Sequence, residues 1–196
     1  QAEDGIGDRS PSRGLGDVYK RQAEDGAVVA KFVATGRDFL VSTSFSKSFS
    51  LYGERVGALS IVCADADEAK RVLSQVKIVI RTNFSNPPTH GAALVATVLG
   101  DPELRALWES ELGGMRTRIK AMRKALVDGL EAAGVEGMGF ITDQVGMFSY
   151  SGLTVEQMQR LRSEYGVYGT DAGRMCVAAL NDSNLDWVIK AIAAVS

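Results

Sequence analysis

The stretch SFSKSFSLYGERVG, residues 44–57, places a single lysine, Lys47, among several serines and follows it with Arg55. The residues before it, DFLVSTSF (38–45), predict a short buried strand, and VGALSIVCA (56–64) is a second apolar run of strand length. Lys47 is therefore expected where a strand ends. A lysine surrounded there by hydroxyl and apolar groups can be desolvated, and desolvation lowers the pKa of its amine.

The side chains of this stretch suit a cofactor that carries an aldehyde and a phosphate. A neutral lysine amine forms a Schiff base with an aldehyde. The hydroxyls of Ser44 and Ser46 and the guanidinium of Arg55 suit a phosphate, for which arginine offers a planar fork of donors. Together these groups describe a seat for pyridoxal 5′-phosphate. On spacing alone, a lysine in an ordinary turn explains the pattern equally well.

The composition excludes several other classes of protein. The 196 residues are 45% apolar and 23% charged with a net charge of −2, which is typical of a soluble globular protein and gives no basic block for nucleic acid. No apolar run approaches the roughly 20 residues that span a membrane. Cys63 and Cys176 lie far apart and no secretion signal opens the chain, which predicts a reduced, cytoplasmic protein. With one histidine, His90, no metal site is expected.

The chain from about Ala27 onward has the pattern of an α/β protein. AVVAKFVA predicts a helix that stops before Gly36, and Asp65 or Asp67 can cap a helix whose apolar positions include Val72 and Val76. The double proline in RTNFSNPPTHG (81–91) ends that helix, and a short buried helix, AALVATVL, follows. Asp101 and Pro102 then open a long helix that ends near Gly134.

The remainder predicts a smaller α+β layer of strand, helix, strand and helix, in MFSYSG, TVEQMQRLRSEYG, RMCVAAL and NLDWVIKAIAAV. Thr154 and Gln157 form a capping box. The element order therefore indicates two parts, a mostly parallel sheet and a smaller C-terminal subdomain. Residues 1–25 fit neither part: QAEDG occurs at 1–5 and again at 22–26 without helical or strand periodicity, so we expect an artefact or a disordered leader.

SFSKSFSLYGERVG closely resembles the cofactor-lysine segment of class I aspartate and aromatic amino acid aminotransferases. The resemblance continues through SNPPTHGA, MRTRIKAMR, GMFSYSGL and GRMCVAAL, and is nearer to the aromatic (tyrosine) branch. It implies a fold-type I pyridoxal-phosphate enzyme that forms a homodimer with shared active sites. Residues 26–113 would be the C-terminal part of the large cofactor-binding domain, and 114–196 the small C-terminal domain.

The resemblance also implies a role for each candidate residue. Lys47 would hold pyridoxal phosphate as a Schiff base and move the proton between the substrate α-carbon and the cofactor. Ser44 and Arg55 would bind the cofactor phosphate, with Ser46 assisting. The substrate would meet three further residues: Arg174 at its α-carboxylate, Arg81 of the neighbouring subunit at a distal carboxylate, and Tyr150 near its side chain. The implied reaction moves an amino group between an aromatic or dicarboxylic L-amino acid and a 2-oxo acid such as 2-oxoglutarate.

Two departures from the family pattern affect these expectations. Asp171 stands three residues before Arg174, where the family has a small apolar residue, and its carboxylate could pair with that arginine. The resemblance also covers only the C-terminal half of the family's fold, without the residues that meet the cofactor ring. A weak or inactive fragment is therefore expected.

Two alternatives remain at this point. A truncated half could serve only as a folding or dimerisation module without catalysis. Ser44 and Lys47 also fit the S-x-x-K motif of serine acyl-enzyme hydrolases, which opens a helix, although the companion S-D-N and K-T-G motifs are absent from the sequence.

Overall fold

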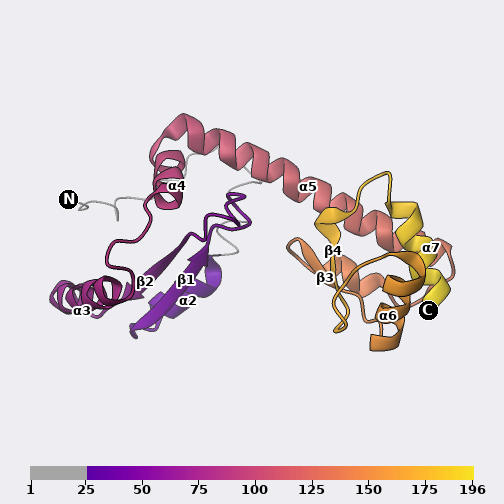
Figure 1. The fold of residues 1–196 in the computed structure, drawn as a ribbon, viewed down its shortest axis with the longest axis horizontal. Coiled ribbons are helices and arrows are strands. Elements are labelled where there is room, and N and C mark those ends of the chain that lie inside the picture. Colours follow the sequence, from indigo (N-terminus) through magenta and orange to yellow (C-terminus); the bar gives the residue numbers. More distant parts are fainter. Residues whose placement is uncertain (1–25) are drawn as a thin grey trace. The chain divides into compact units, whose positions relative to one another are not determined.

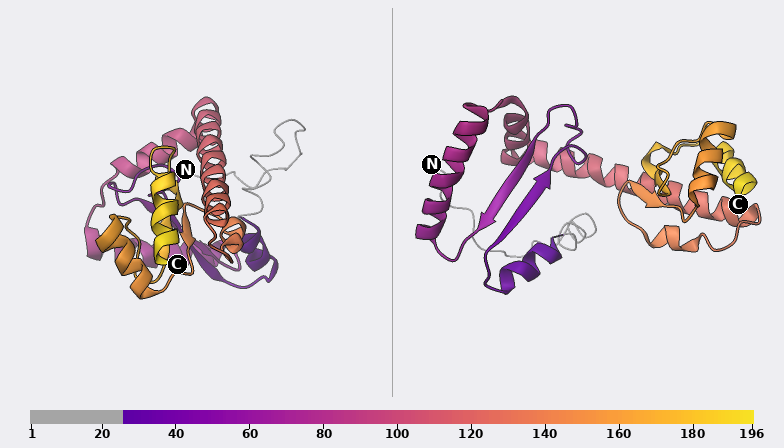
Figure 2. Two further views of the ribbon diagram at one scale, coloured as in Figure 1. Left: turned by 90° about the vertical axis from the view of Figure 1, so that its right-hand side faces the viewer. Right: turned by 60° about the horizontal axis from the view of Figure 1, so that its bottom comes forward.

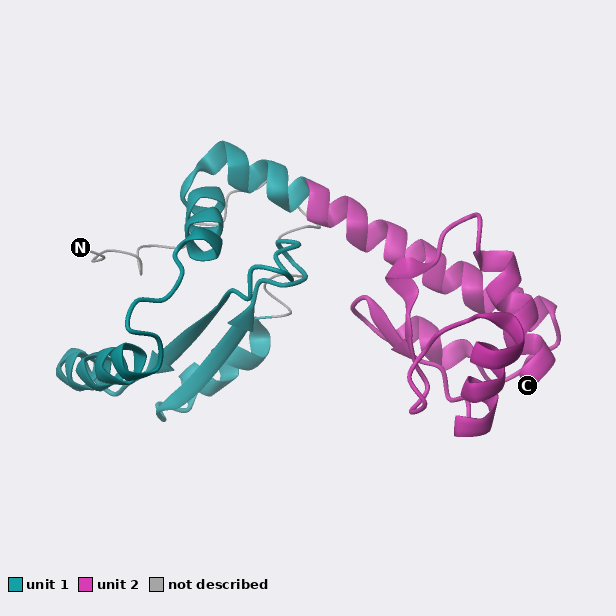
Figure 3. Cartoon of the chain, in the orientation of Figure 1, with its two compact units in different colours: residues 1–110 teal, residues 111–196 magenta. Residues whose placement is uncertain are grey.

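A computed structural model describes residues 26–196, so the prediction for residues 1–25 lies outside the described residues. The chain divides into two compact units, residues 1–110 and 111–196 (Figure 3). The division falls inside one long helix, α5 (Pro102–Ala132), where the sequence analysis put a domain boundary after residue 113. The assignment of the two parts to a large and a small domain stays a prediction.

The strands of the first unit are β1 (Phe39–Ser44) and β2 (Gly57–Val62), close to the predicted positions. They pair antiparallel, from Phe39 opposite Val62 to Ser44 opposite Gly57, so the parallel pairing expected of the large domain is not seen in this pair (Figure 1). The reason is that residues 45–56 turn the chain straight back. Gly57 is required there, because a β-carbon would lie 2.6 Å from the carbonyl oxygen of Thr43.

The prediction that these strands are buried is wrong for the chain as described. The side chains of Leu40 and Leu59 are 66% and 58% exposed. Among residues 26–196, β1 and β2 have only each other as hydrogen-bonded neighbours. A strand is buried by the elements that pack on its faces, and the described part of the chain supplies too few of them to this unit.

The helices of the first unit begin and end where local signals predict. They are α2 (Ala27–Ala34), α3 (Ala66–Phe84) and α4 (His90–Gly100) (Figure 1). Asp65 caps α3, since its carboxylate accepts a bond from the Glu68 N–H at 2.7 Å, and the Glu68 carboxylate accepts from the Ala64 N–H at 2.8 Å. However, α3 has no buried residue, so its predicted apolar face is uncovered among the described residues.

The long helix α5 has the predicted start and end. The Asp101 carboxylate accepts bonds from the N–H groups of Glu103 and Leu104 at 2.9 and 3.0 Å. At the other end Gly134 adopts a φ of +82°, and the next N–H, of Val135, donates to the carbonyl of Leu130 at 2.9 Å. Only glycine adopts that left-handed conformation without strain, which is why the helix stops there.

The second unit has its own hydrophobic core. It contains β3 (Phe148–Tyr150) antiparallel to β4 (Arg174–Cys176), with helices α6 (Val155–Tyr165) and α7 (Leu185–Val195) (Figures 1 and 2). Short 3-10 helices cover Gly139–Asp143 and Val177–Ala179, so the strand predicted in RMCVAAL ends at Cys176. The core comprises Leu126, Leu130, Val135, Leu153, Met158, Leu161, Met175, Val177, Leu180, Ala191, Ile192 and Val195. The predicted capping box of Thr154 and Gln157 is confirmed.

Neither Cys63 nor Cys176 is in a disulfide. Over residues 26–196, no helix combines the length and the apolar character needed to cross a bilayer.

Candidate functional site

The two serines predicted to bind phosphate lie together at the end of β1. The hydroxyl of Ser44 donates to the hydroxyl of Ser46 at 3.1 Å, and the backbone N–H of Ser46 donates to the Ser44 hydroxyl at 3.3 Å. This local arrangement is a turn that the short polar side chain of Ser44 stabilises. The two hydroxyls therefore lie within hydrogen-bond distance of each other, in the segment that carries Lys47.

Tyr52 brings the predicted lysine and arginine together. The Lys47 ammonium lies 4.4 Å from the centroid of the Tyr52 ring, and the Arg55 guanidinium lies 5.3 Å from the same centroid. Arg55 also donates to the Tyr52 carbonyl at 2.9 Å. Cations are attracted to the face of an aromatic ring, so one exposed tyrosine gathers both basic groups. The sequence analysis assigned no role to Tyr52.

The environment of Lys47 differs from the expected desolvated one. Its side chain is exposed, as are those of Tyr52 and Arg55. The described residues of this unit supply an aromatic ring, hydroxyls and a guanidinium to the lysine, but they do not enclose it. The expectation of a buried amine is therefore wrong for this chain, for the same reason that β1 is exposed.

Aromatic packing anchors the loop that carries Lys47. Phe49 stacks on Trp108 with ring centroids 4.6 Å apart, and Phe45 meets Phe49 edge to face at 5.4 Å. The indole N–H of Trp108 donates to the Ser48 carbonyl at 2.8 Å. The first turns of α5 thus hold the residues on both sides of Lys47. The sequence analysis assigned no role to Trp108, although a half-buried indole N–H needs an acceptor and so signals a partner.

Arg81 and His90 lie on the helices of the first unit. Arg81 is exposed in the last turn of α3, and its carbonyl accepts the N–H of Ser85 that ends the helix. The resemblance gives Arg81 a role in a neighbouring subunit, which stays a prediction. His90 is the first residue of α4.

In the second unit, Arg174 and Tyr150 lie opposite each other across the β3–β4 pair. Both side chains are exposed. The Arg174 guanidinium lies 5.1 Å from the centroid of the Phe148 ring. Two of the predicted substrate-binding residues are therefore brought together within one unit, on one face of a short sheet.

The expected pairing of Asp171 with Arg174 is wrong. The Asp171 carboxylate instead forms an ion pair with Arg162 of α6 at 2.5 Å, and the same guanidinium donates to the Gly169 carbonyl at 3.2 Å. The backbone explains the choice: Gly173, with φ of +83°, turns the chain between Asp171 and Arg174. The Arg174 guanidinium therefore lies near the Phe148 ring, and the ion pair of Asp171 joins the turn before Arg174 to α6.

This ion pair predicts a dependence of stability on pH. The hydrogen bond and charge of Arg162 lower the pKa of Asp171 in the folded chain. Its stabilisation is therefore fully present above the carboxyl's unfolded pKa of about 3.9 and is lost as pH falls through the lower folded value. In urea unfolding, we expect Asp171→Asn to lower the midpoint slightly at pH 7, and the difference from the unsubstituted chain to disappear in acid.

The control is Asp182→Asn, which changes an exposed carboxylate without an ion pair among the described residues. If the midpoint of Asp171→Asn differs from that of the unsubstituted chain by the same amount at every pH, the prediction is contradicted.

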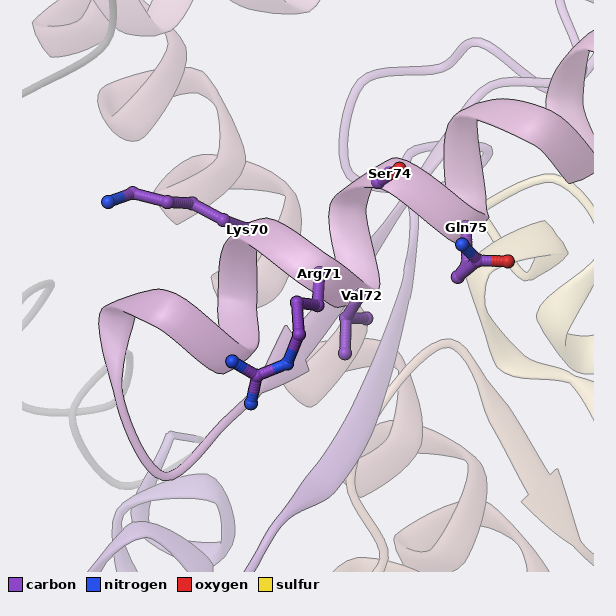
Figure 4. Close-up of a pocket in the computed structure, with 5 residues that line it drawn as sticks. All are labelled: Lys70, Arg71, Val72, Ser74 and Gln75. Atoms are coloured by element: carbon purple, nitrogen blue, oxygen red, sulfur yellow. The ribbon is translucent and has the colours of Figure 1, made fainter.

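Two hollows of the described chain are lined by other residues. A hollow of about 510 Å³ is lined by Lys70, Arg71, Val72, Ser74 and Gln75. All five belong to α3, and Figure 4 shows their side chains pointing in different directions from that single helix, so they converge on no ligand. Another, of about 240 Å³, lies beside β4 and is lined in part by Cys176 and Trp187. Neither is lined by a predicted site residue.

Comparisons with known proteins show the family to which the chain belongs. The family model for class I and II aminotransferases matches residues 16–192. The chain is 62% identical over 170 residues to an aspartate aminotransferase of Pseudomonas aeruginosa, covering 86% of this chain and 43% of the relative. It is 51% identical over 173 residues to the aromatic-amino-acid aminotransferase of Escherichia coli, covering 88% and 44%. The chain therefore belongs to the class I and II aminotransferase family.

A solved structure supports the fold. The crystal structure of an aromatic-amino-acid aminotransferase from Burkholderia pseudomallei, covalently bound to pyridoxal phosphate, matches with a TM-score of 0.84 and 64% identity. The match covers 88% of this chain and 43% of that one. The predicted fold class, a partial fold-type I aminotransferase, is confirmed. The chain spans less than half the length of the relatives it matches.

Proposed function

We propose that this chain is part of a pyridoxal-phosphate-dependent aminotransferase that moves an amino group between an aromatic or dicarboxylic L-amino acid and a 2-oxo acid such as 2-oxoglutarate. One observation carries the proposal: Lys47 and Arg55 meet on the Tyr52 ring, at the end of a strand, in a member of the aminotransferase family. We extend the proposal to a cytoplasmic homodimer, in keeping with the two free cysteines.

The residues of the Lys47 loop fit the cofactor. The lysine supplies an amine for its aldehyde, and the Ser44 and Ser46 hydroxyls with the Arg55 guanidinium supply donors for its phosphate. Pyridoxal phosphate, when bound, supplies the electron sink that stabilises a carbanion at the substrate α-carbon. This chemistry requires the amine and the phosphate donors within one ligand's length, and the shared Tyr52 ring brings them that close.

The remaining roles follow from the chemistry of each side chain. Lys47 holds the cofactor and then moves the proton at the substrate α-carbon. Arg174 binds the α-carboxylate, for which a guanidinium offers two parallel N–H donors. Tyr150 lies beside Arg174 and contacts the substrate side chain. Arg81 reaches a distal carboxylate in the partner subunit's site when the substrate is dicarboxylic.

We favour aromatic substrates because of the residues around Arg174. Phe148 lies under its guanidinium, and the rings of Tyr150 and Phe140 have centroids 6.5 Å apart, so aromatic surface borders the carboxylate-binding residue. The names of the relatives are divided between aspartate and aromatic amino acids, so the preference depends on this geometry and on the sequence resemblance.

The serine-hydrolase alternative lacks its structural requirement. The S-x-x-K motif needs a helix that begins at the serine. Ser44 is instead the last residue of β1, and the segment after it forms turns.

The proposal is tested by amino-group transfer. The chain is incubated with pyridoxal phosphate, 2-oxoglutarate and either L-tyrosine or L-aspartate, and glutamate is measured against free pyridoxal phosphate alone. Glutamate above that background, faster with L-tyrosine, supports the proposal and the aromatic preference. Glutamate at the background rate with either donor favours the alternative, a non-catalytic folding or dimerisation module.

A further inference from the structure

A buried arginine lies behind the substrate-binding residues of the second unit. Arg123 of α5 is only 3% exposed. Its Nε donates to the hydroxyl of Ser149 at 3.1 Å and its Nη2 donates to the carbonyl of Gly146 at 2.6 Å. Burial lowers the pKa of this guanidinium. A buried cation is tolerated only when its N–H groups have hydrogen-bond acceptors, and these two bonds provide them. The same two bonds join α5 to the start of β3.

Those bonds act on the strand that carries Tyr150. Ser149 is 2% exposed, whereas its neighbours Phe148 and Tyr150 point to the opposite, exposed face, as alternation along a strand requires. Arg174 lies on that same exposed face, because it is paired with Tyr150. Arg123 therefore holds the buried side of a strand whose other side presents the candidate substrate groups.

The backbone groups of Tyr150 on the edge of β3 away from β4 are also hydrogen-bonded. The side-chain amide of Gln144 donates to the Tyr150 carbonyl at 2.9 Å and accepts from the Tyr150 N–H at 2.7 Å. Both backbone groups of Tyr150 thus point away from β4. Tyr150 and Arg174 are then a non-hydrogen-bonded antiparallel pair, the kind in which facing side chains lie closest.

Polar bonds fix β4 on both sides of Arg174. Before it, the Ser151 hydroxyl donates to the Gly173 carbonyl at 2.8 Å. After it, the Arg118 guanidinium donates to the carbonyls of Ala178 and Leu180 at 2.7 and 2.8 Å. Because Ser151 directly follows Tyr150, the Ser151 bond and the Arg123 bonds to Ser149 and Gly146 act on both sides of Tyr150 and so set where it lies relative to Arg174.

We propose that Arg123 is a positioning residue: by holding Ser149 and Gly146, it keeps Tyr150 and Arg174 side by side to receive one carboxylate-bearing substrate. The inference rests on the proposed function, because that function gives Arg174 its carboxylate. It adds a residue, remote from the ligand, that sets how well the two groups converge.

The test uses nuclear magnetic resonance on the full 196-residue chain. The first readout is the order of the Arg174 Nε–H group and its nuclear Overhauser contact with the Phe148 ring. The second is the shift of the same resonance on titration with 3-phenylpropionate, an aromatic carboxylate that lacks an amino group. The variants are Arg123→Met, Arg123→Lys and Ser149→Ala, and Lys120→Met is the control, an exposed cation on the same helix.

We expect Arg123→Met to weaken the contact with Phe148 and to lower the affinity for 3-phenylpropionate by about tenfold, as the loss of an outer partner does at metal sites. Arg123→Lys keeps one donor and should have a smaller effect, and Lys120→Met should have none. Ser149→Ala removes one acceptor of Arg123 with little change of volume, so it tests the positioning role if Arg123→Met fails to fold.

An Arg174 resonance with unchanged order and an unchanged contact with Phe148 in the folded variants overturns the positioning role. Arg174→Ala separates the two claims. If Arg174→Ala leaves 3-phenylpropionate binding unchanged, or the unsubstituted chain shows no binding, the carboxylate role of Arg174 fails, while the contact with Phe148 still decides whether Arg123 positions it.

Discussion

Replacing Lys47 with alanine should abolish the specific covalent capture of pyridoxal phosphate by this chain. After incubation and reduction with borohydride, peptide mass analysis is expected to find the pyridoxyl group mainly on Lys47, and a reducible visible absorbance band should accompany it. The proposed reason is proximity: if the side chains of Ser44, Ser46 and Arg55 bind the cofactor phosphate, they hold its aldehyde near the Lys47 amine and raise its effective concentration there. Without that amine, the band and the labelled peptide should both be lost.

Two comparisons make this result specific. Lys77→Ala removes an exposed lysine of α3 and should leave the band unchanged. Arg55→Ala should reduce labelling by pyridoxal phosphate but not by pyridoxal, which has no phosphate for the guanidinium to bind. Labelling spread evenly over the exposed lysines, with Lys47→Ala indistinguishable from the unsubstituted chain, would mean that the loop does not hold the cofactor in this chain.

The sequence predicted the ends of the helices well because their signals are local. Asp65, Asp101 and the Thr154–Gln157 pair each bond to backbone groups within three residues, so the sequence contains both partners. The same holds for Gly134, whose left-handed φ needs no distant contact. Helix ends of this kind can therefore be predicted from the sequence without knowledge of the fold.

Burial and pairing could not be predicted in this way because they depend on distant partners. The apolar runs of β1 and α3 are typical of a buried sheet and its covering helix, yet their exposure depends on what other elements supply. The sequence allowed Asp171 to pair with Arg174, three residues further on, whereas in the fold it pairs with Arg162. Arg123 gave no signal of its own, since its acceptors come from a loop and a strand more than twenty residues later.

Replacing Leu130 with alanine should remove much of the stability of the second unit. Leu130 is fully buried in the core between α5, α6 and α7 and belongs to a cluster in which many side chains are under 2% exposed. Truncating a buried leucine loses the burial of its methyl groups and leaves a cavity, which together cost about 3 kcal/mol. We expect a loss of that size in the free energy of unfolding by urea, followed by the fluorescence of Trp187 in a Trp108→Phe background, so that the signal comes from the second unit.

The comparison is Val145→Ala, a truncation in the same unit at a side chain that is 78% exposed. Exposed positions of this kind usually change the free energy of unfolding by no more than about 0.5 kcal/mol. A loss at Leu130 as small as that at Val145 would contradict the core described for residues 111–196. A large loss of unfolding free energy at Leu130 alone would show that the second unit is stabilised by its own hydrophobic core. The exposed strands and helix of the first unit have no such core among the described residues.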